Sequence, residues 1–128
     1  MHLNDNGKLK TNAFRPKAGT DEVSVMRHDF MGSDGCKTKA REIAATKYQG
    51  LAVLRAREIR EVGASVEDSR VYYCGHAHIA FGFVLPIGEP PTSDRSEQLV
   101  KKLQALKRAA RYCADPNPSG ATWTGETI

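Results

Sequence analysis

The stretch over residues 71–85, VYYCGHAHIAFGFVL, constrains the fold more than any other part of the chain. Its odd-numbered positions are apolar, aromatic or glycine throughout, and side chains along a β-strand alternate between its two faces. We therefore predict a strand over 71–85 that turns one face to a hydrophobic core. The even-numbered face carries Tyr72, Cys74, His76 and His78, so any chemistry on this strand has to come from that face.

Helical and extended patterns surround this stretch. Residues 36–48 hold good helix formers without glycine or proline, which predicts a helix. Short apolar runs around Val23 and over 51–54 predict strands, while residues 64–70 read as a connector and Asn6-Gly7 as a tight turn. A helix is predicted over 94–113 because apolar residues recur there at helical spacing. These residues are Leu99, Leu103, Leu106, Ala110 and Cys113.

Strands mixed irregularly with helices of unequal length are typical of the α+β class. We predict an α+β fold in which a small mixed or antiparallel sheet is packed on one side by two to three helices. A parallel βαβ crossover between residues 51 and 113 is the alternative. At 128 residues the chain fits one domain, and we place it over 1–114, followed by a loop-like C-terminal tail over 115–128.

The composition narrows the class of protein. No apolar stretch is long enough to span a bilayer, and no apolar segment follows the charges of the N-terminus. The three cysteines are widely spaced and form no C-x-x-C pair, so neither a disulfide framework nor a standard zinc motif is indicated. The sequence predicts an intracellular, cytoplasmic protein that uses no membrane and no cofactor.

Positive charge is concentrated in two segments of this chain, whose net charge is +4. Residues 35–60 hold seven Lys and Arg against two Glu, and residues 93–114 hold six against one Asp and one Glu. Such segments are typical of partners of RNA, DNA or an acidic protein surface, although solvated helix faces have the same composition. The candidate partner-binding residues are Arg15, Lys37, Lys39, Lys101, Lys102, Lys107, Arg108 and Arg111.

The His-x-His pair on the predicted strand allows three functional interpretations. His76 and His78 could act as general acid and base on a phosphodiester, with Tyr72 and Cys74 on the same face as further candidate catalytic residues. They could also be two ligands of a metal ion, if one is bound, or could contact a phosphate or a base without chemistry. The alternative is that both histidines serve packing and solvation only.

We predict a small basic binding protein that engages nucleic acid or a protein partner through the basic faces of its helices. The first alternative is a small nuclease or phosphodiesterase that uses His76 and His78. The second is a structural subunit of a larger complex, with exposed apolar residues such as Phe30 and Trp123 covered by another chain.

Overall fold

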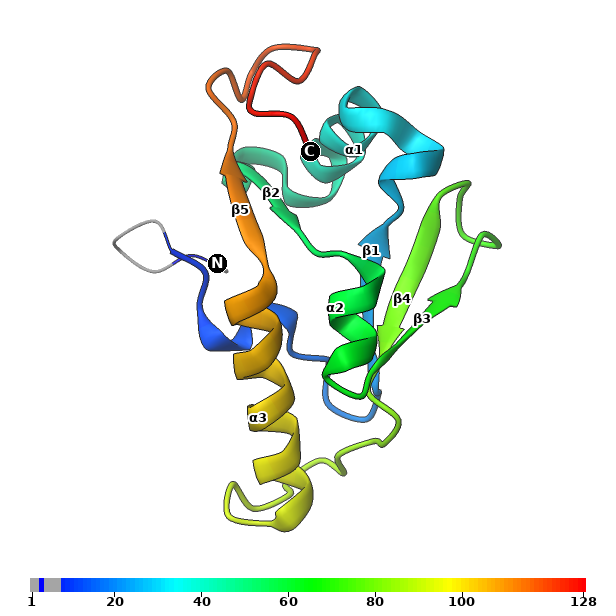
Figure 1. Ribbon diagram of the computed structural model, residues 1–128, viewed down its shortest axis with the longest axis vertical. Coiled ribbons are helices and arrows are strands. Elements are labelled where there is room, and N and C mark those ends of the chain that lie inside the picture. The colour runs from blue at the N-terminus through cyan, green and yellow to red at the C-terminus, as the bar shows by residue number, and fades with distance from the viewer. Residues whose placement is uncertain (1–2, 4–7) are drawn as a thin grey trace.

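The computed structural model describes residue 3 and residues 8–128, so the predicted turn at Asn6-Gly7 lies outside the described part of the chain. Helices α1 and α3 lie toward opposite ends of the long axis, and the strands lie between them (Figure 1). The elements in chain order are η1 (Thr11–Phe14), β1 (Glu22–Met26), α1 (His28–Ala44), η2 (Ala45–Lys47), β2 (Gly50–Val53), α2 (Ala56–Glu61), β3 (Ser65–Asp68), β4 (His76–Ala80), α3 (Asp94–Ala109) and β5 (Arg111–Ala114).

The strands form two antiparallel sheets. One has three strands in the order β1-β4-β3 with β4 in the centre, and the other pairs β2 with β5. Helices pack against these sheets, which confirms the α+β class. Among the described strands every pairing is antiparallel, so the alternative with a parallel crossover is not found.

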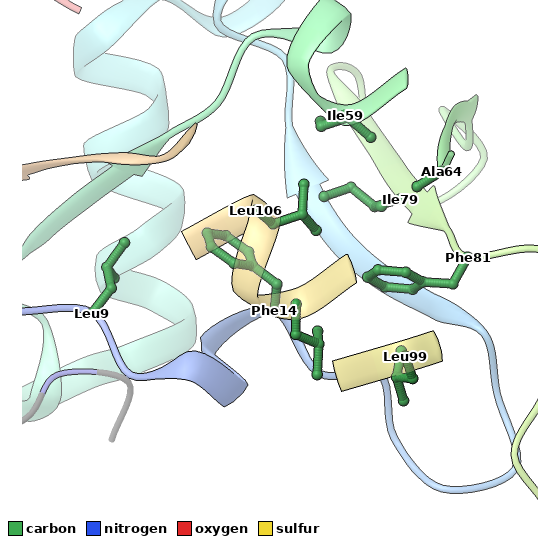
Figure 2. Packing of buried hydrophobic residues seen from close by; sticks show 9 residues of the cluster. Leu9, Phe14, Ile59, Ala64, Ile79, Phe81, Leu99 and Leu106 are labelled. Carbon is green, nitrogen blue, oxygen red and sulfur yellow. The ribbon is translucent and has the colours of Figure 1, made fainter. Parts of the chain in front are cut away.

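The main core lies between α3 and the three-stranded sheet. Side chains from η1, α2, α3 and β4 converge there (Figure 2). Ala77, Ile79 and Phe81 are all buried, as the alternation of the sequence predicts, and so are Leu99, Leu103 and Leu106 of the predicted stripe on α3. Burying each of these larger side chains contributes about 1.5–3 kcal/mol through the hydrophobic effect.

The strand of the histidines is shorter than predicted. It begins at His76 rather than at residue 71, and the segment before it, 69–75, is the turn that connects β3 to β4. Gly75 has a φ of +89°, a left-handed conformation that ends the turn and that glycine adopts without strain. Val71 is consequently 89% exposed instead of buried, and the predicted connector at 64–70 contains the edge strand β3.

Both long helices also differ from their predicted bounds. Helix α1 begins earlier, at His28, and is kinked at Gly32, whose φ of 68° and ψ of 172° are not helical. Helix α3 ends at Ala109, because Ala110 takes an extended conformation and the chain continues into β5. Cys113 is therefore buried on a strand, paired with Leu51 of β2, and is not part of the helix stripe.

Residues 115–128 form no helix or strand but lie against α1 (Figure 1). Lys37 of α1 is fully buried and pairs with Asp115 at 2.9 Å, and its Nζ also donates to the carbonyls of Asn117 and Thr122. Tyr48 donates its hydroxyl proton to the same carboxylate. A second, smaller core of Cys36, Tyr48 and Leu51 packs beneath this segment, with Trp123 against it.

Charge and burial act in opposite directions on Asp115. Burial opposes its ionisation, but hydrogen bonds from Tyr48, Lys37 and the Asn117 amide outweigh this effect and lower its pKa. The pKa of Tyr48 is raised, first by burial and then by its hydrogen bond to Asp115. The network is therefore a lysine–carboxylate ion pair with a neutral phenol.

Within the described residues, no helix is both long enough and apolar enough to cross a membrane.

Candidate functional site

The two histidines of β4 have different surroundings. His76 is buried, and its Nδ1 shares a hydrogen bond with the hydroxyl of Ser69 and lies 3.2 Å from the Ser69 carbonyl oxygen. The rings of Tyr72 and Tyr73 stand edge-on to it, each with a centroid 4.9 Å from that of the imidazole. The contacts of His76 with Ser69, Tyr72 and Tyr73 therefore hold the turn over 69–75 in place.

His78 lies in the middle of the three-stranded sheet. It is flanked in register by Ser24 of β1 and Glu67 of β3, and its Nε2 lies 3.5 Å from a carboxylate oxygen of Glu22. Its side chain is 18% exposed. His76 and His78 are two residues apart on β4 and share a face of the sheet, but the contacts that the structure records for them are with different residues, Ser69 for His76 and Glu22 for His78.

The other members of the predicted catalytic group lie on the turn. Tyr72 and Cys74 precede the start of β4 at His76, so neither shares a strand face with the histidines; Tyr72 is 74% exposed and Cys74 is exposed as well. Among the described residues, no group of three His, Cys, Asp or Glu side chains is arranged to hold a metal ion.

The turn is fixed to the first turn of α1. The backbone amide of Arg27 donates to the carbonyl of Gly75 at 2.8 Å. Gly75 approaches the helix so closely that an added Cβ would lie 2.4 Å from Cγ of Met31. The β3–β4 turn and the start of α1 therefore lie side by side (Figure 1).

Two guanidinium groups and one carboxylate surround Phe30 at this junction. The Arg27 guanidinium lies 4.3 Å from the centroid of the Phe30 ring, and that of Arg70 lies 5.7 Å from it. Asp68 pairs with both arginines, at 2.9 Å and 2.7 Å. The hydrogen bond from Arg70 lowers the pKa of Asp68, so this carboxylate is charged at neutral pH. The cluster carries two positive charges against one negative.

A second cation–aromatic contact also joins α1 to the turn over 69–75. The ammonium of Lys39 lies 4.4 Å from the centroid of the Tyr73 ring and 3.1 Å from a carboxylate oxygen of Glu42. We use the name "turn surface" for the cationic and aromatic side chains of these two contacts, together with the exposed Tyr72. Its members are Arg27, Phe30, Lys39, Arg70, Tyr72 and Tyr73.

One polar atom of the turn surface stands out. Nε of Arg27 is buried and has no hydrogen-bond partner among the described residues, although Nη2 of the same guanidinium pairs with Asp68. A buried donor without a partner costs about 1–3 kcal/mol and is rare in folded proteins. The fold therefore holds this guanidinium over Phe30 at a cost in free energy.

The predicted partner-binding residues are scattered. Lys101, Lys107 and Arg108 lie on α3, outside its buried stripe of Leu99, Leu103 and Leu106, and α3 is a separate helix from α1 (Figure 1). The remaining residues of the predicted set hold structural contacts, apart from Lys39 of the turn surface and the exposed Arg15. Three residues of the set have such structural contacts. Lys37 is buried against Asp115, and Lys102 donates to the carbonyls of Gly63 and Phe81. Arg111 contacts Glu126 and the carbonyl of Thr127.

The sequence singled out Tyr72 and Lys39 but missed Arg27, Arg70 and Tyr73 as site candidates. A signal was present in SRVYYCG, where an arginine and two tyrosines precede a glycine. Reading this segment as strand assigned the two tyrosines to opposite faces. The structure brings them together because the segment is a turn.

Comparison with known proteins gives no further guide to this surface. Neither the models of known protein families, nor the curated proteins, nor the solved structures contain a match to this chain. The functional argument therefore rests on the chemistry of the described residues.

Proposed function

We propose that the protein binds single-stranded nucleic acid through the turn surface. The observation that carries the proposal is the pairing of cations with aromatic rings: Arg27 and Arg70 at Phe30, and Lys39 at Tyr73. Aromatic rings stack with unpaired bases, and guanidinium and ammonium groups neutralise the phosphates that alternate with those bases.

Exposure supports a ligand at this place. Tyr72 is 74% exposed and Phe30 is 49% exposed, so both rings meet solvent rather than the core. A single strand offers base faces to such rings, whereas the bases of a duplex are already stacked on each other. The excess of positive over negative charge in the cluster around Phe30 matches a polyanion.

The basic residues of α3 have a supporting role in this proposal. Lys101, Lys107 and Arg108 lie on α3, away from α1 and the β3–β4 turn (Figure 1), so they do not extend the turn surface directly. They contribute to the net charge of +4, which attracts a polyanion at a distance and raises its association rate at low salt.

The geometry gives less support to the alternative of acid–base catalysis. His76 is buried beneath the tyrosines with its Nδ1 engaged by Ser69, and His78 faces Glu22. A general acid and a general base have to reach the same phosphate, within hydrogen-bond distance of the protons they transfer. In this proposal His76 positions the two tyrosines and contacts no ligand.

Fluorescence anisotropy with labelled 12-nucleotide single strands, oligo-U and oligo-dT, and with a duplex of the same length tests the proposal. We expect the single strands to bind more tightly than the duplex, with an affinity that falls as salt rises. Tyr72→Ala should weaken binding roughly 5- to 150-fold, from about 1–3 kcal/mol per stacked base, whereas Tyr72→Phe should retain most of the affinity.

Arginine variants separate charge from stacking. Arg70→Ala should reduce the slope of log affinity against log salt by about 0.7, the value for one phosphate contact on a single strand. Arg60→Ala, which removes an exposed arginine from α2, is the matched control and should leave both affinity and slope nearly unchanged. Equal affinities for Tyr72→Ala and Tyr72→Phe, or no binding of any oligonucleotide, would exclude the proposal and leave a protein partner as the explanation for the exposed rings.

A further inference from the structure

A pocket with no residue in common with the turn surface lies at the start of α3. Its walls are the loop over 15–20, the loop over 82–89 and Leu99 of α3. The backbone amide of Gly19 donates to the carbonyl of Leu85 at 3.4 Å, which ties the two loops together. The pocket has a volume of about 170 Å³. A cavity of roughly 150 Å³ is enough to hold benzene, so the pocket suits a single ring or a short branched chain.

The inner wall of the pocket is apolar. Leu99 is buried, and Phe83 and Leu85 are partly buried and pack against the main core. The ammonium of Lys102 lies over the Phe83 ring, 5.4 Å from its centroid. Small-ligand sites combine such an apolar lining with a few polar groups that fix orientation.

The polar groups at the rim are two cations and one carboxylate. Arg15 and Lys17 are exposed, and Glu89 is partly buried. The guanidinium of Arg15 makes no hydrogen bond or ion pair with the residues that the structure describes. The proline at position 16 restricts the backbone dihedral angles on both sides of the Arg15–Pro16 bond. The Arg15 side chain therefore extends from a backbone segment with little conformational freedom.

We infer that this pocket binds a small carboxylate that carries an apolar ring or branched chain. The apolar part fills the space beside Phe83, Leu85 and Leu99, and the carboxylate accepts hydrogen bonds from the guanidinium of Arg15. Arginine binds carboxylates through two parallel hydrogen bonds, which orients the ligand. Arg15 and Lys17 carry two positive charges and Glu89 carries one negative charge, so the net charge of the rim is +1. The rim therefore favours a monoanion over a neutral ligand.

Phenylacetate and phenylacetamide make a matched pair of probes for this inference. They have the same number of heavy atoms and the same ring, and they differ in the polar group: the carboxylate is negatively charged and only accepts hydrogen bonds, whereas the neutral amide also donates them. Amide chemical shifts in a ¹⁵N-labelled sample, followed during titration, should move for residues of the loops 15–20 and 82–89. We expect phenylacetate to bind with a Kd of about a millimolar, as suits a ligand of this size, and phenylacetamide to bind at least roughly 5-fold more weakly.

Three variants decide which features matter. Arg15→Ala should weaken phenylacetate binding at least roughly 5-fold and remove the preference over the amide. Ala18→Phe places a ring in the pocket and should block both probes. Arg60→Ala, which removes an exposed arginine outside the pocket, should bind both probes as the wild type does. Equal binding of the two probes, unchanged binding by Arg15→Ala, or shifts that leave the two loops and the surroundings of Leu99 unchanged would overturn the inference.

Discussion

Replacement of Lys37 by methionine tests how the C-terminal segment is held. The ammonium of Lys37 is 0% exposed and contacts the Asp115 carboxylate at 2.9 Å and the carbonyls of Asn117 and Thr122 at 2.7 and 2.8 Å. Methionine fills nearly the same space but donates no hydrogen bond. It would leave Asp115 as a buried carboxylate that keeps only the hydrogen bonds from Tyr48 and the Asn117 amide.

Removal of one partner from a buried ion pair costs about 3–5 kcal/mol. The total free energy of unfolding of a domain is about 5–15 kcal/mol, so we expect Lys37→Met to remove a large fraction of it. Lys39→Met is the matched control, since it is the same substitution on the same helix. The ion pair of Lys39 with Glu42 is partly exposed, and its loss should cost about 1 kcal/mol or less.

Two optical signals, followed during urea titration, distinguish local unfolding of the 115–128 segment from unfolding of the whole protein. Trp123 is the single tryptophan and donates its backbone amide to Asp34 of α1, so its fluorescence reports the 115–128 segment. Far-UV circular dichroism reports the helices. In the wild type we expect the two transitions to coincide, and in Lys37→Met we expect the fluorescence transition to move to lower urea. If Lys37→Met is as stable as Lys39→Met, the reasoning about the buried pair is refuted.

The same network and the core give three further predictions. The hydrogen bonds that lower the pKa of Asp115 stabilise the fold at pH values above the ordinary aspartate pKa, which is near 4. This stabilisation is lost as the pH falls through the lowered pKa. The acid limb of a curve of stability against pH should therefore be shallower in Asp115→Asn. Because the pKa of Tyr48 is raised, its neutral phenol stabilises the fold below about pH 10, and this stabilisation is lost as the pH rises above that value. Tyr48→Phe should therefore flatten the alkaline limb of the same curve. Leu103→Ala, at a buried position of α3, should lower the free energy of unfolding by about 2–5 kcal/mol in urea titration, and a loss below 1 kcal/mol would contradict the core assignment.

The parts of the fold that were predictable depend on short-range periodicity. The stripe of Leu99, Leu103 and Leu106 repeats at helical spacing, and Ile79 and Phe81 alternate with more exposed neighbours on β4. In both segments the pattern is set by neighbours within a few residues, because one face of each element packs on the same core. Local sequence is sufficient to predict such elements.

The ends of those elements were not predictable in the same way. The apolar pattern continues past the end of α3 to Cys113 and back before β4 to Val71, yet the chain changes conformation at both points. At Cys113 the backbone pairs with Leu51 of β2, and at Gly75 it bonds to Arg27. Both partners lie far away along the chain, so no local pattern reveals them.

Burial of Lys37 shows the same limit for a charged residue. Lys37 and Lys39 are two residues apart on one basic helix, and composition alone makes them equivalent. In the structure one ammonium is enclosed by Asp115 and two carbonyls, while the other lies over an aromatic ring near the surface. The difference depends on the path of the C-terminal segment across α1, which the sequence does not encode in any local pattern.

The segment of the histidine pair shows that residues close together in sequence can have different surroundings. His76 and His78 drew attention because imidazoles are versatile, but the exposed groups of the same segment are Arg70 and Tyr72. His76 is buried, with Ser69 and the rings of Tyr72 and Tyr73 in contact with its imidazole. If the turn surface binds as proposed, the contribution of His76 is geometric: its ring sets the positions of both tyrosines, and a substitution there would alter binding through the turn rather than through a lost contact with the ligand.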